Sequence, residues 1–133
     1  MAQPVMLAFN FGGDRLQCLR RVCMSKHIRL MERSAEEASK PLAVFFGMAP
    51  DCESADDGAS FPDEVLVMHG FTPGGMNAFL HAWRQAGQTP VRLKAALTPT
   101  NLTWTVTQLH EELVKEDNAM QLHEGSVHQN TKA

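Results

Sequence analysis

Residues 5–11 read Val-Met-Leu-Ala-Phe-Asn-Phe and are followed by a turn, Gly12-Gly13-Asp14. Sixty positions later, residues 65–71 read Val-Leu-Val-Met-His-Gly-Phe and lead into a second turn, Thr72-Pro73-Gly74-Gly75. Both runs are apolar at successive positions, which is typical of a central strand that is covered on two faces. The pair therefore predicts two central strands, each ending in a glycine-containing turn.

A helical pattern begins after each turn and is followed by a strand-like run. Residues 28–32 and 91–97 alternate apolar and polar side chains, which is typical of edge strands. The halves 4–33 and 64–98 are therefore predicted to be two β-α-β units from an internal repeat. The apolar positions with helical spacing are Leu16, Leu19, Val22 and Cys23 in the first half and Met76, Phe79, Leu80 and Trp83 in the second.

Two architectures share this pattern of two central and two edge strands. One is a doubly wound parallel α/β sheet of order 2-1-3-4, and the other is a ferredoxin-like α+β sheet of order 4-1-3-2. The linker 34–63 is long for a hairpin and contains the apolar run 41–47, so a parallel crossover is favoured. The ferredoxin-like alternative stays open because such folds carry long insertions.

The remaining segments are a helix, an acidic loop and a tail. Thr105-Val-Thr-Gln108 is a capping-box pattern that opens a predicted helix over 104–120. Residues 51–64 hold six acidic groups and no basic ones, which indicates a loop within the linker. Residues 1–121 are thus predicted to form a single α/β domain, with 122–133 as a flexible tail.

The second half carries a family resemblance. The string Lys94-Ala-x-Leu-Thr-x-x-Asn101-x-x-Trp104 is its most specific part. Over roughly residues 64–118 the chain resembles DUF3783, a small bacterial domain of unknown function, and the first half resembles the N-terminal extension of its longer members. The resemblance implies a bacterial cytosolic protein and supplies no catalytic residue.

Composition excludes several classes of protein. The chain has 133 residues with 12 Lys and Arg against 15 Asp and Glu, which argues against nucleic acid as a partner. Its apolar runs are shorter than the ~18–20 residues of a membrane span, and its start lacks the features of a signal peptide. We expect a cytoplasmic location with no membrane partner. No spacing of metal ligands and no Gly-rich nucleotide motif is present, so we expect no metal and no cofactor.

The candidate site is the loop 98–104 together with Lys94. It lies between a strand and a helix start, where free backbone N–H groups and the helix dipole favour an anion. In a parallel sheet the turns at 10–14 and 69–75 would converge on the same edge. The alternative is that these are ordinary turn and capping residues. The predicted ligand-binding residues are Lys94, Thr98, Asn101, Trp104, Asn10, Gly12, Gly13, His69, Thr72 and Gly74.

Three functions follow as hypotheses. The first is a non-catalytic ligand-binding or regulatory module for a small anionic metabolite. The second is a protein-interaction module or homodimer that acts through the basic first helix, which carries Arg20 and Arg21. The third and least favoured is an enzyme acting on a small anionic substrate, because no activated nucleophile is apparent. The sequence identifies neither the ligand nor a catalytic residue.

Overall fold

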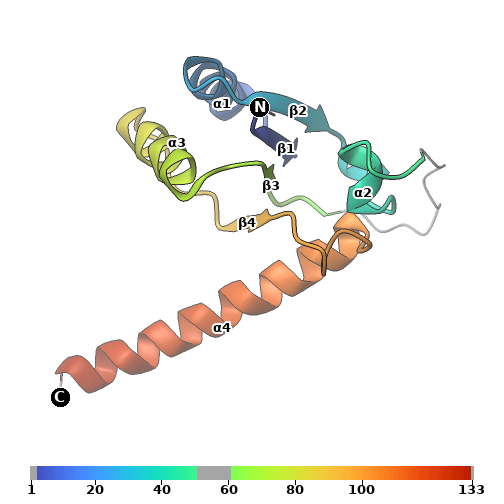
Figure 1. Ribbon diagram of the computed structural model, residues 1–133. Coiled ribbons are helices and arrows are strands. Elements are labelled where there is room, and N and C mark those ends of the chain that lie inside the picture. Colours follow the sequence, from blue (N-terminus) through green and yellow to red (C-terminus); the bar gives the residue numbers. More distant parts are fainter. Residues whose placement is uncertain (1–2, 51–60, 133) are drawn as a thin grey trace.

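The computed structural model describes the backbone of residues 3–50 and 61–132, and the side chains as far as Met120 except that of Ala35. Strands and helices alternate along this part of the chain (Figure 1). The elements are β1 (Val5–Phe9), α1 (Gly13–Ser25), β2 (Arg29–Arg33), the 3-10 turn η1 (Ala35–Glu37), α2 (Leu42–Phe45), β3 (Val65–His69), α3 (Pro73–Gln85), β4 (Leu93–Ala96) and α4 (Val106–Lys132). The predicted β-α-β order of each half is confirmed, while its origin in a duplicated sequence stays a prediction.

The four strands form one open sheet of order β2-β1-β3-β4. This confirms the α/β class and the order 2-1-3-4. β1 is parallel to β2 and β3 is parallel to β4, as predicted. The central pair is antiparallel, with Val5 opposite His69 and Phe9 opposite Val65. The expectation of an all-parallel sheet is therefore wrong, and the sheet is mixed.

The reversed direction changes what the linker has to do. The last residue of β2 and the first residue of β3 lie at the same end of the sheet, because β2 is parallel to β1 and β1 is antiparallel to β3. The chain therefore needs no net crossing of the sheet between them. The apolar run 41–47 forms α2 instead, which buries Leu42, Ala43 and Phe45. The described part of the linker thus covers a face of the sheet rather than crossing over it.

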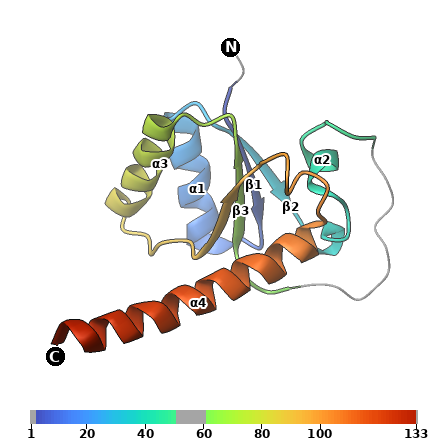
Figure 2. The same cartoon turned by 60° about the horizontal axis from the view of Figure 1, so that its bottom comes forward.

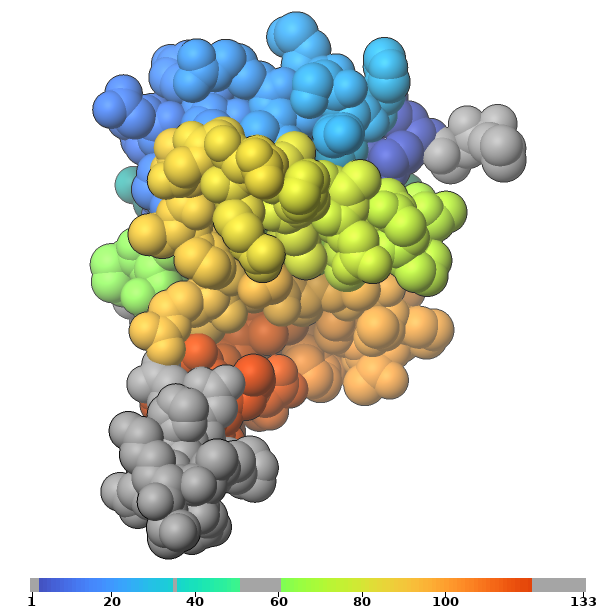
Figure 3. Space-filling view, turned by 90° about the vertical axis from the view of Figure 1, so that its left-hand side faces the viewer, coloured from blue at the N-terminus to red at the C-terminus, as the bar shows by residue number. Residues whose placement is uncertain are grey.

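The helices lie in two layers around the sheet (Figure 2). Crossover connections between parallel strands are nearly always right-handed. Two units that run and step in opposite directions then place both helices, α1 and α3, on one face. These two helices lie side by side in Figure 3. Met6, Ala8, Leu66 and Met68 pack in the core beneath them.

The second face is covered by α2 and α4. Its core contains the alternate strand residues Leu7, Phe9, Val65 and Val67, together with Leu109 and Leu113 of α4. Both faces of the central strands are thus buried, as their uninterrupted apolar runs predicted. The ring of Phe9 meets that of Phe45 edge-on at 5.7 Å between centroids.

The C-terminal helix begins as predicted. The Thr105 backbone N–H donates to Gln108 Oε1 at 2.8 Å, and the Gln108 N–H donates to Thr105 Oγ1 at 3.1 Å. α4 then continues past the sheet to Lys132, beyond the predicted end at residue 120 (Figure 1). Met120, expected in its buried stripe, is 59% exposed because it lies on the projecting part.

Several predictions concern parts of the chain that lie outside the described residues. Most of the acidic loop, residues 51–60 with Cys52, lies outside the described residues. The side chains of the tail 122–133 also lie outside them, so its flexibility stays a prediction. The same holds for the bounds 1–121 of a single domain. Among the described residues, no helix is long and apolar enough to cross a membrane.

Candidate functional site

The antiparallel central pair separates the predicted site into two groups. The turn 10–14 follows β1, so it lies at the end of the sheet where β3 begins. The turns 69–75 and 98–104 lie at the opposite end, where the Leu97 N–H donates to the Met68 carbonyl at 2.8 Å. The expected convergence of all three turns on one edge is therefore wrong. We call the first end the Arg15 end, after the residue that joins its elements, and the second the cavity end, after a cavity at the start of α3 that is described below.

At the first end, Arg15 forms hydrogen bonds with two separate parts of the chain and lies against the ring of a third residue. Its Nε and Nη2 donate to the Glu64 carboxylate at 2.8 and 2.7 Å. Its Nη1 donates to the Thr89 carbonyl at 3.2 Å and to Thr89 Oγ1 at 2.9 Å. The guanidinium also lies over the Trp83 ring, 5.1 Å from the ring centroid. The hydrogen bond to Glu64 raises the pKa of Arg15. Arg15 thus joins α1 to the starts of β3 and β4.

Asn10 has a similar role at this end. Its Nδ2 donates to the Phe61 carbonyl at 2.7 Å and to the Asp63 carbonyl at 2.8 Å. Its φ of +65° lies in the left-handed region, which asparagine tolerates better than most residues. Gly12 caps α1 and Gly13 follows it, and both are exposed. The predicted ligand-binding amide of Asn10 is therefore already hydrogen-bonded within the chain.

A groove of about 700 Å³ opens at the Arg15 end between α4 and the residues before β4. Its charged groups are paired with one another. Arg92 lies 3.3 Å from Asp117, and Arg15 lies 2.7 Å from Glu64. The His110 Nε2 is hydrogen-bonded to Asp63 Oδ2 at 2.8 Å, and the His110 ring stacks on Phe61. These contacts hold the surrounding elements together and leave few charges for a ligand.

The loop 98–104 also uses its polar groups internally. Asn101 is only 7% exposed. Its Oδ1 accepts from the Thr98 N–H at 2.8 Å, its Nδ2 donates to the Ala96 carbonyl at 3.0 Å, and its own N–H donates to Thr98 Oγ1 at 3.1 Å. Trp104 is partly buried against the α2/α4 core. These contacts favour the alternative interpretation, in which the loop residues form an ordinary turn.

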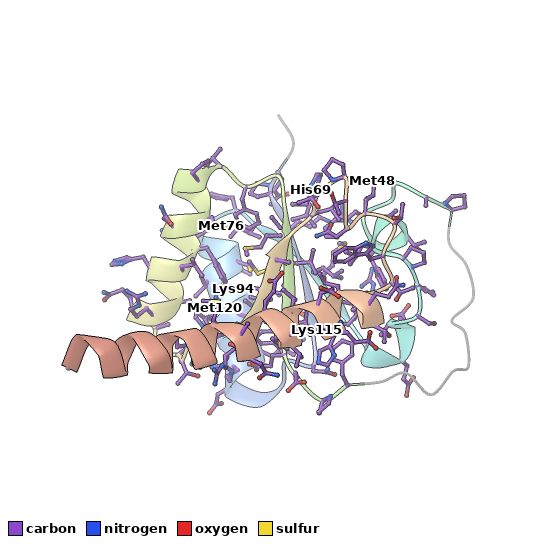
Figure 4. All side chains as sticks on the ribbon, turned by 90° about the horizontal axis from the view of Figure 1, so that it is seen from below. Met48, His69, Met76, Lys94, Lys115 and Met120 are labelled. Atoms are coloured by element: carbon purple, nitrogen blue, oxygen red, sulfur yellow. The ribbon has the colours of Figure 1, made fainter. Side chains whose placement is uncertain are left out.

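Lys94 and His69 lie apart from each other (Figure 4). The Lys94 Nζ donates to the Val91 carbonyl at 2.9 Å. It lines a small hollow of about 110 Å³ on the side of Trp83 and α3. The His69 ring meets the Phe46 ring edge-on at 5.7 Å, on the side of α2. The structure does not bring these two predicted residues into one site.

The basic face of α1 is partly neutralised. Arg20 donates two hydrogen bonds of 2.8 Å to Glu32 of β2. This contact raises the pKa of Arg20 and lowers that of Glu32. Arg21 is exposed on the same helix. The hypothesis of an interaction surface on this helix stays a prediction.

The cavity end contains an apolar cavity at the start of α3, with a volume of about 550 Å³. We call it the α3 cavity. Lys26 is the only charged residue among the described residues that line it. The lining comes from the start of β1, the end of α1, the turn after β3 and the first turns of α3, with residues Pro4, Lys26, Ile28, Gly70, Phe71, Thr72, Gly75 and Ala78.

Two features of the local sequence shape this cavity. Gly70 has a φ of +79°, in the left-handed region that favours glycine, so the turn after β3 suits this residue. Thr72 caps α3, because its Oγ1 accepts from the Gly75 N–H at 2.9 Å. Of the predicted site residues, Thr72 lines the cavity and Gly74 is its exposed neighbour in the first turn of α3.

The sequence alone missed most of the cavity lining. Lys26, Ile28 and Pro4 come from the first unit, whereas Phe71 and Ala78 come from the second. They meet because the units run in opposite directions, which places the end of α1 beside the start of α3. A prediction that β1 and β3 are antiparallel would have placed the end of α1 beside the start of α3.

The described residues offer little reactive chemistry. Cys18 and Cys23 are buried free thiols, and burial raises the pKa of Cys23 to about 12. A thiol with such a pKa is protonated at neutral pH and is a weak nucleophile. Among the described residues, no group of three His, Cys, Asp or Glu side chains is placed to hold a metal ion.

Comparison with known proteins identifies a family for the second half. Residues 64–120 match the family described as "Domain of unknown function (DUF3783)". The resemblance seen in the sequence is thereby confirmed. The match contains β3, α3, β4 and the first half of α4. It includes Phe71, Thr72 and Ala78 of the cavity but not Lys26. Neither curated proteins nor solved structures gave a match.

Proposed function

We propose that the chain is a ligand-binding module and that the α3 cavity binds a small anionic molecule. The observation that carries the proposal is an apolar cavity with a single cation at its rim. Its volume of about 550 Å³ falls within the usual range for small-molecule sites. Such sites combine apolar walls with a few polar groups that orient the ligand.

The state of Lys26 supports an anion as the ligand. Among the described residues, no hydrogen bond or ion pair engages its ammonium group. The positive end of the α3 dipole lies at the same cavity, and Lys26 itself stands at the negative end of the α1 dipole. By contrast, the arginines of the Arg15 end already bind carboxylates of the chain. An incoming anion there would have to displace them.

The proposal carries two further expectations. We place the protein in the bacterial cytoplasm, on the basis of its composition and its resemblance to DUF3783. We assign it binding rather than catalysis, because its buried cysteines are poor nucleophiles. A regulatory role would follow if ligand binding changed the association of the chain with a partner.

Thermal denaturation with a panel of small anionic metabolites tests the proposal. A ligand that binds only the folded chain raises the melting temperature through RT ln(1 + [L]/Kd). Ala78→Met introduces a larger side chain that fills part of the cavity, whereas Ala119→Met makes the same change on an exposed turn of α4. We expect the wild type and Ala119→Met to respond and Ala78→Met to lose the response.

Two results would contradict the proposal. One is a panel in which no anion shifts the melting temperature of the wild type. The other is an equal shift for Ala78→Met and Ala119→Met, which would place binding outside the α3 cavity. Circular dichroism of each variant without ligand checks that the fold is retained.

A further inference from the structure

We infer that the ligand of the α3 cavity carries a single carboxylate on an apolar body, rather than a phosphate. This inference rests on the proposed function and specifies the chemical class of the ligand. It follows from three properties of the cavity: its walls, its charge and the hydrogen-bond donors at the start of α3.

The walls favour an apolar body. Ile28 is buried, and Phe71 packs partly against the core beneath α1 and α3. Pro4 and Ala78 add further apolar surface. An apolar group of the ligand would gain about 25 cal/mol for each Å² that it buries against these side chains. A polar sugar or polyol would find few partners for its hydroxyl groups among the described lining residues.

The charge at the cavity matches a monoanion. Lys26 supplies one positive charge, and no second cation lines the cavity among the described residues. A phosphate monoester carries a charge of about −1.5 to −2 at neutral pH and three acceptor oxygens. A carboxylate carries one charge on two oxygens, so one ammonium group and one further donor satisfy most of its needs.

The first turn of α3 has few donors left for a phosphate. Pro73 has no N–H, the Gly75 N–H donates to Thr72 Oγ1, and the Met76 N–H donates to the Thr72 carbonyl at 2.9 Å. Gly74 retains the remaining N–H of this turn. The sequence Thr72-Pro-Gly-Gly75 is rich in glycine, as phosphate-binding turns are. In this turn, however, the Gly75 N–H that could bind a phosphate already donates to Thr72 Oγ1. Unpaired phosphate oxygens beside apolar walls would cost desolvation energy.

Three compounds with the same ring separate these classes: phenylacetate, phenyl phosphate and phenylacetamide. Titrations followed by the amide NMR signals of Gly74 and Gly75 report binding at the site itself. We expect phenylacetate to bind about tenfold or more tightly than either other compound, as one charge-assisted hydrogen bond implies. Lys26→Gln should lower the affinity for phenylacetate by about tenfold and leave the affinity for phenylacetamide unchanged. The control variant Lys115→Gln, on the exposed surface of α4, should change neither affinity.

Thr72→Val gives a second, independent test. It keeps the shape of the side chain but releases the Gly75 N–H from Thr72 Oγ1. We expect the affinity for phenyl phosphate to rise relative to that for phenylacetate. The Gly75 amide signal shows whether the N–H has been freed, so a stable variant with unchanged preference would count against the donor argument.

The outcomes distinguish this inference from the proposal beneath it. Tighter binding of phenyl phosphate than of phenylacetate to the wild type would overturn the carboxylate inference and leave an anion site in place. Equal binding of phenylacetamide and phenylacetate would overturn the role of Lys26. If no member of the series and no metabolite binds the cavity, the proposed function itself fails.

Discussion

At the Arg15 end, Arg15, Asn10 and His110 each form hydrogen bonds with residues more than 45 positions away in the sequence. At the cavity end, the ammonium group of Lys26 has no such partner among the described residues, and the walls around it are apolar. The loop 98–104 also lies at the cavity end but packs toward α2. Its Asn101 side-chain amide is already hydrogen-bonded to the Thr98 N–H and the Ala96 carbonyl. The comparison shows that the polar side chains named at the Arg15 end are engaged within the chain, whereas the α3 cavity has mainly apolar walls and one charged lining residue among those described.

The largest expected effect is the loss of stability in Arg15→Ala. The change removes the paired hydrogen bonds to Glu64 and leaves that carboxylate without its partner. We expect the free energy of unfolding to fall by about 2 kcal/mol, since Arg15 is partly exposed. Lys26→Ala at the cavity end should stay within ~0.5 kcal/mol of the wild type. Urea denaturation of both variants measures the difference.

Equal losses in these two variants would break the comparison. A large loss in Lys26→Ala would mean that this residue supports the fold, and the α3 cavity would lose its uncommitted cation. A negligible loss in Arg15→Ala would mean that its contacts contribute little beyond what water provides.

A smaller effect is expected at Asn10, where two causes can be separated. Asn10→Ala removes the hydrogen bonds to the Phe61 and Asp63 carbonyls and places alanine at a φ of +65°. We expect a loss of about 1–2 kcal/mol by urea denaturation. Asn10→Gly loses the same hydrogen bonds but adopts this φ without strain, so it should be less destabilised. A glycine variant that is less stable than the alanine variant would contradict this account.

The smallest effect concerns the exposed pair of Arg20 and Glu32, which joins α1 to the edge strand β2. The hydrogen bond from Arg20 lowers the pKa of Glu32 below its ordinary value of 4.5. A lowered pKa in the folded state stabilises the protein above the ordinary value, and this contribution is lost as pH falls through the folded-state pKa. Arg20→Gln should raise the pKa of Glu32 in an NMR titration and flatten the acid limb of the stability curve.

This pair also serves as a baseline for the comparison. Exposed ion pairs contribute little to stability at neutral pH. If Arg20→Gln lowered the free energy of unfolding at pH 7 as much as Arg15→Ala, then joining several chain segments would not make Arg15 contribute more to stability than an exposed ion pair does. An unchanged pKa of Glu32 would show that the pair does not persist in solution.

Candidate site residues were harder to predict than the elements that carry them. Thr72 and Gly74 are predicted because a glycine-containing turn after an apolar strand is a local signal; Thr72 lines the α3 cavity and Gly74 is its neighbour in the first turn of α3. Lys26 is not predicted as a site residue, because nothing near it in the sequence indicates a cavity. Asn10 and Asn101 have the residue types of ligand-binding loops, but their amides are used by carbonyl groups of the chain. Short-range patterns do not reveal such partners.

The sequence by itself determined the order of strands and helices, the two edge strands and the capping box of α4, because each depends on side-chain periodicity or on residues a few positions apart. Tertiary structure alone decided the direction of β3 against β1. Parallel and antiparallel ladders both satisfy the backbone of an apolar strand, so an apolar run does not encode its direction. The antiparallel pairing brings the end of α1 to the start of α3, where the cavity lies.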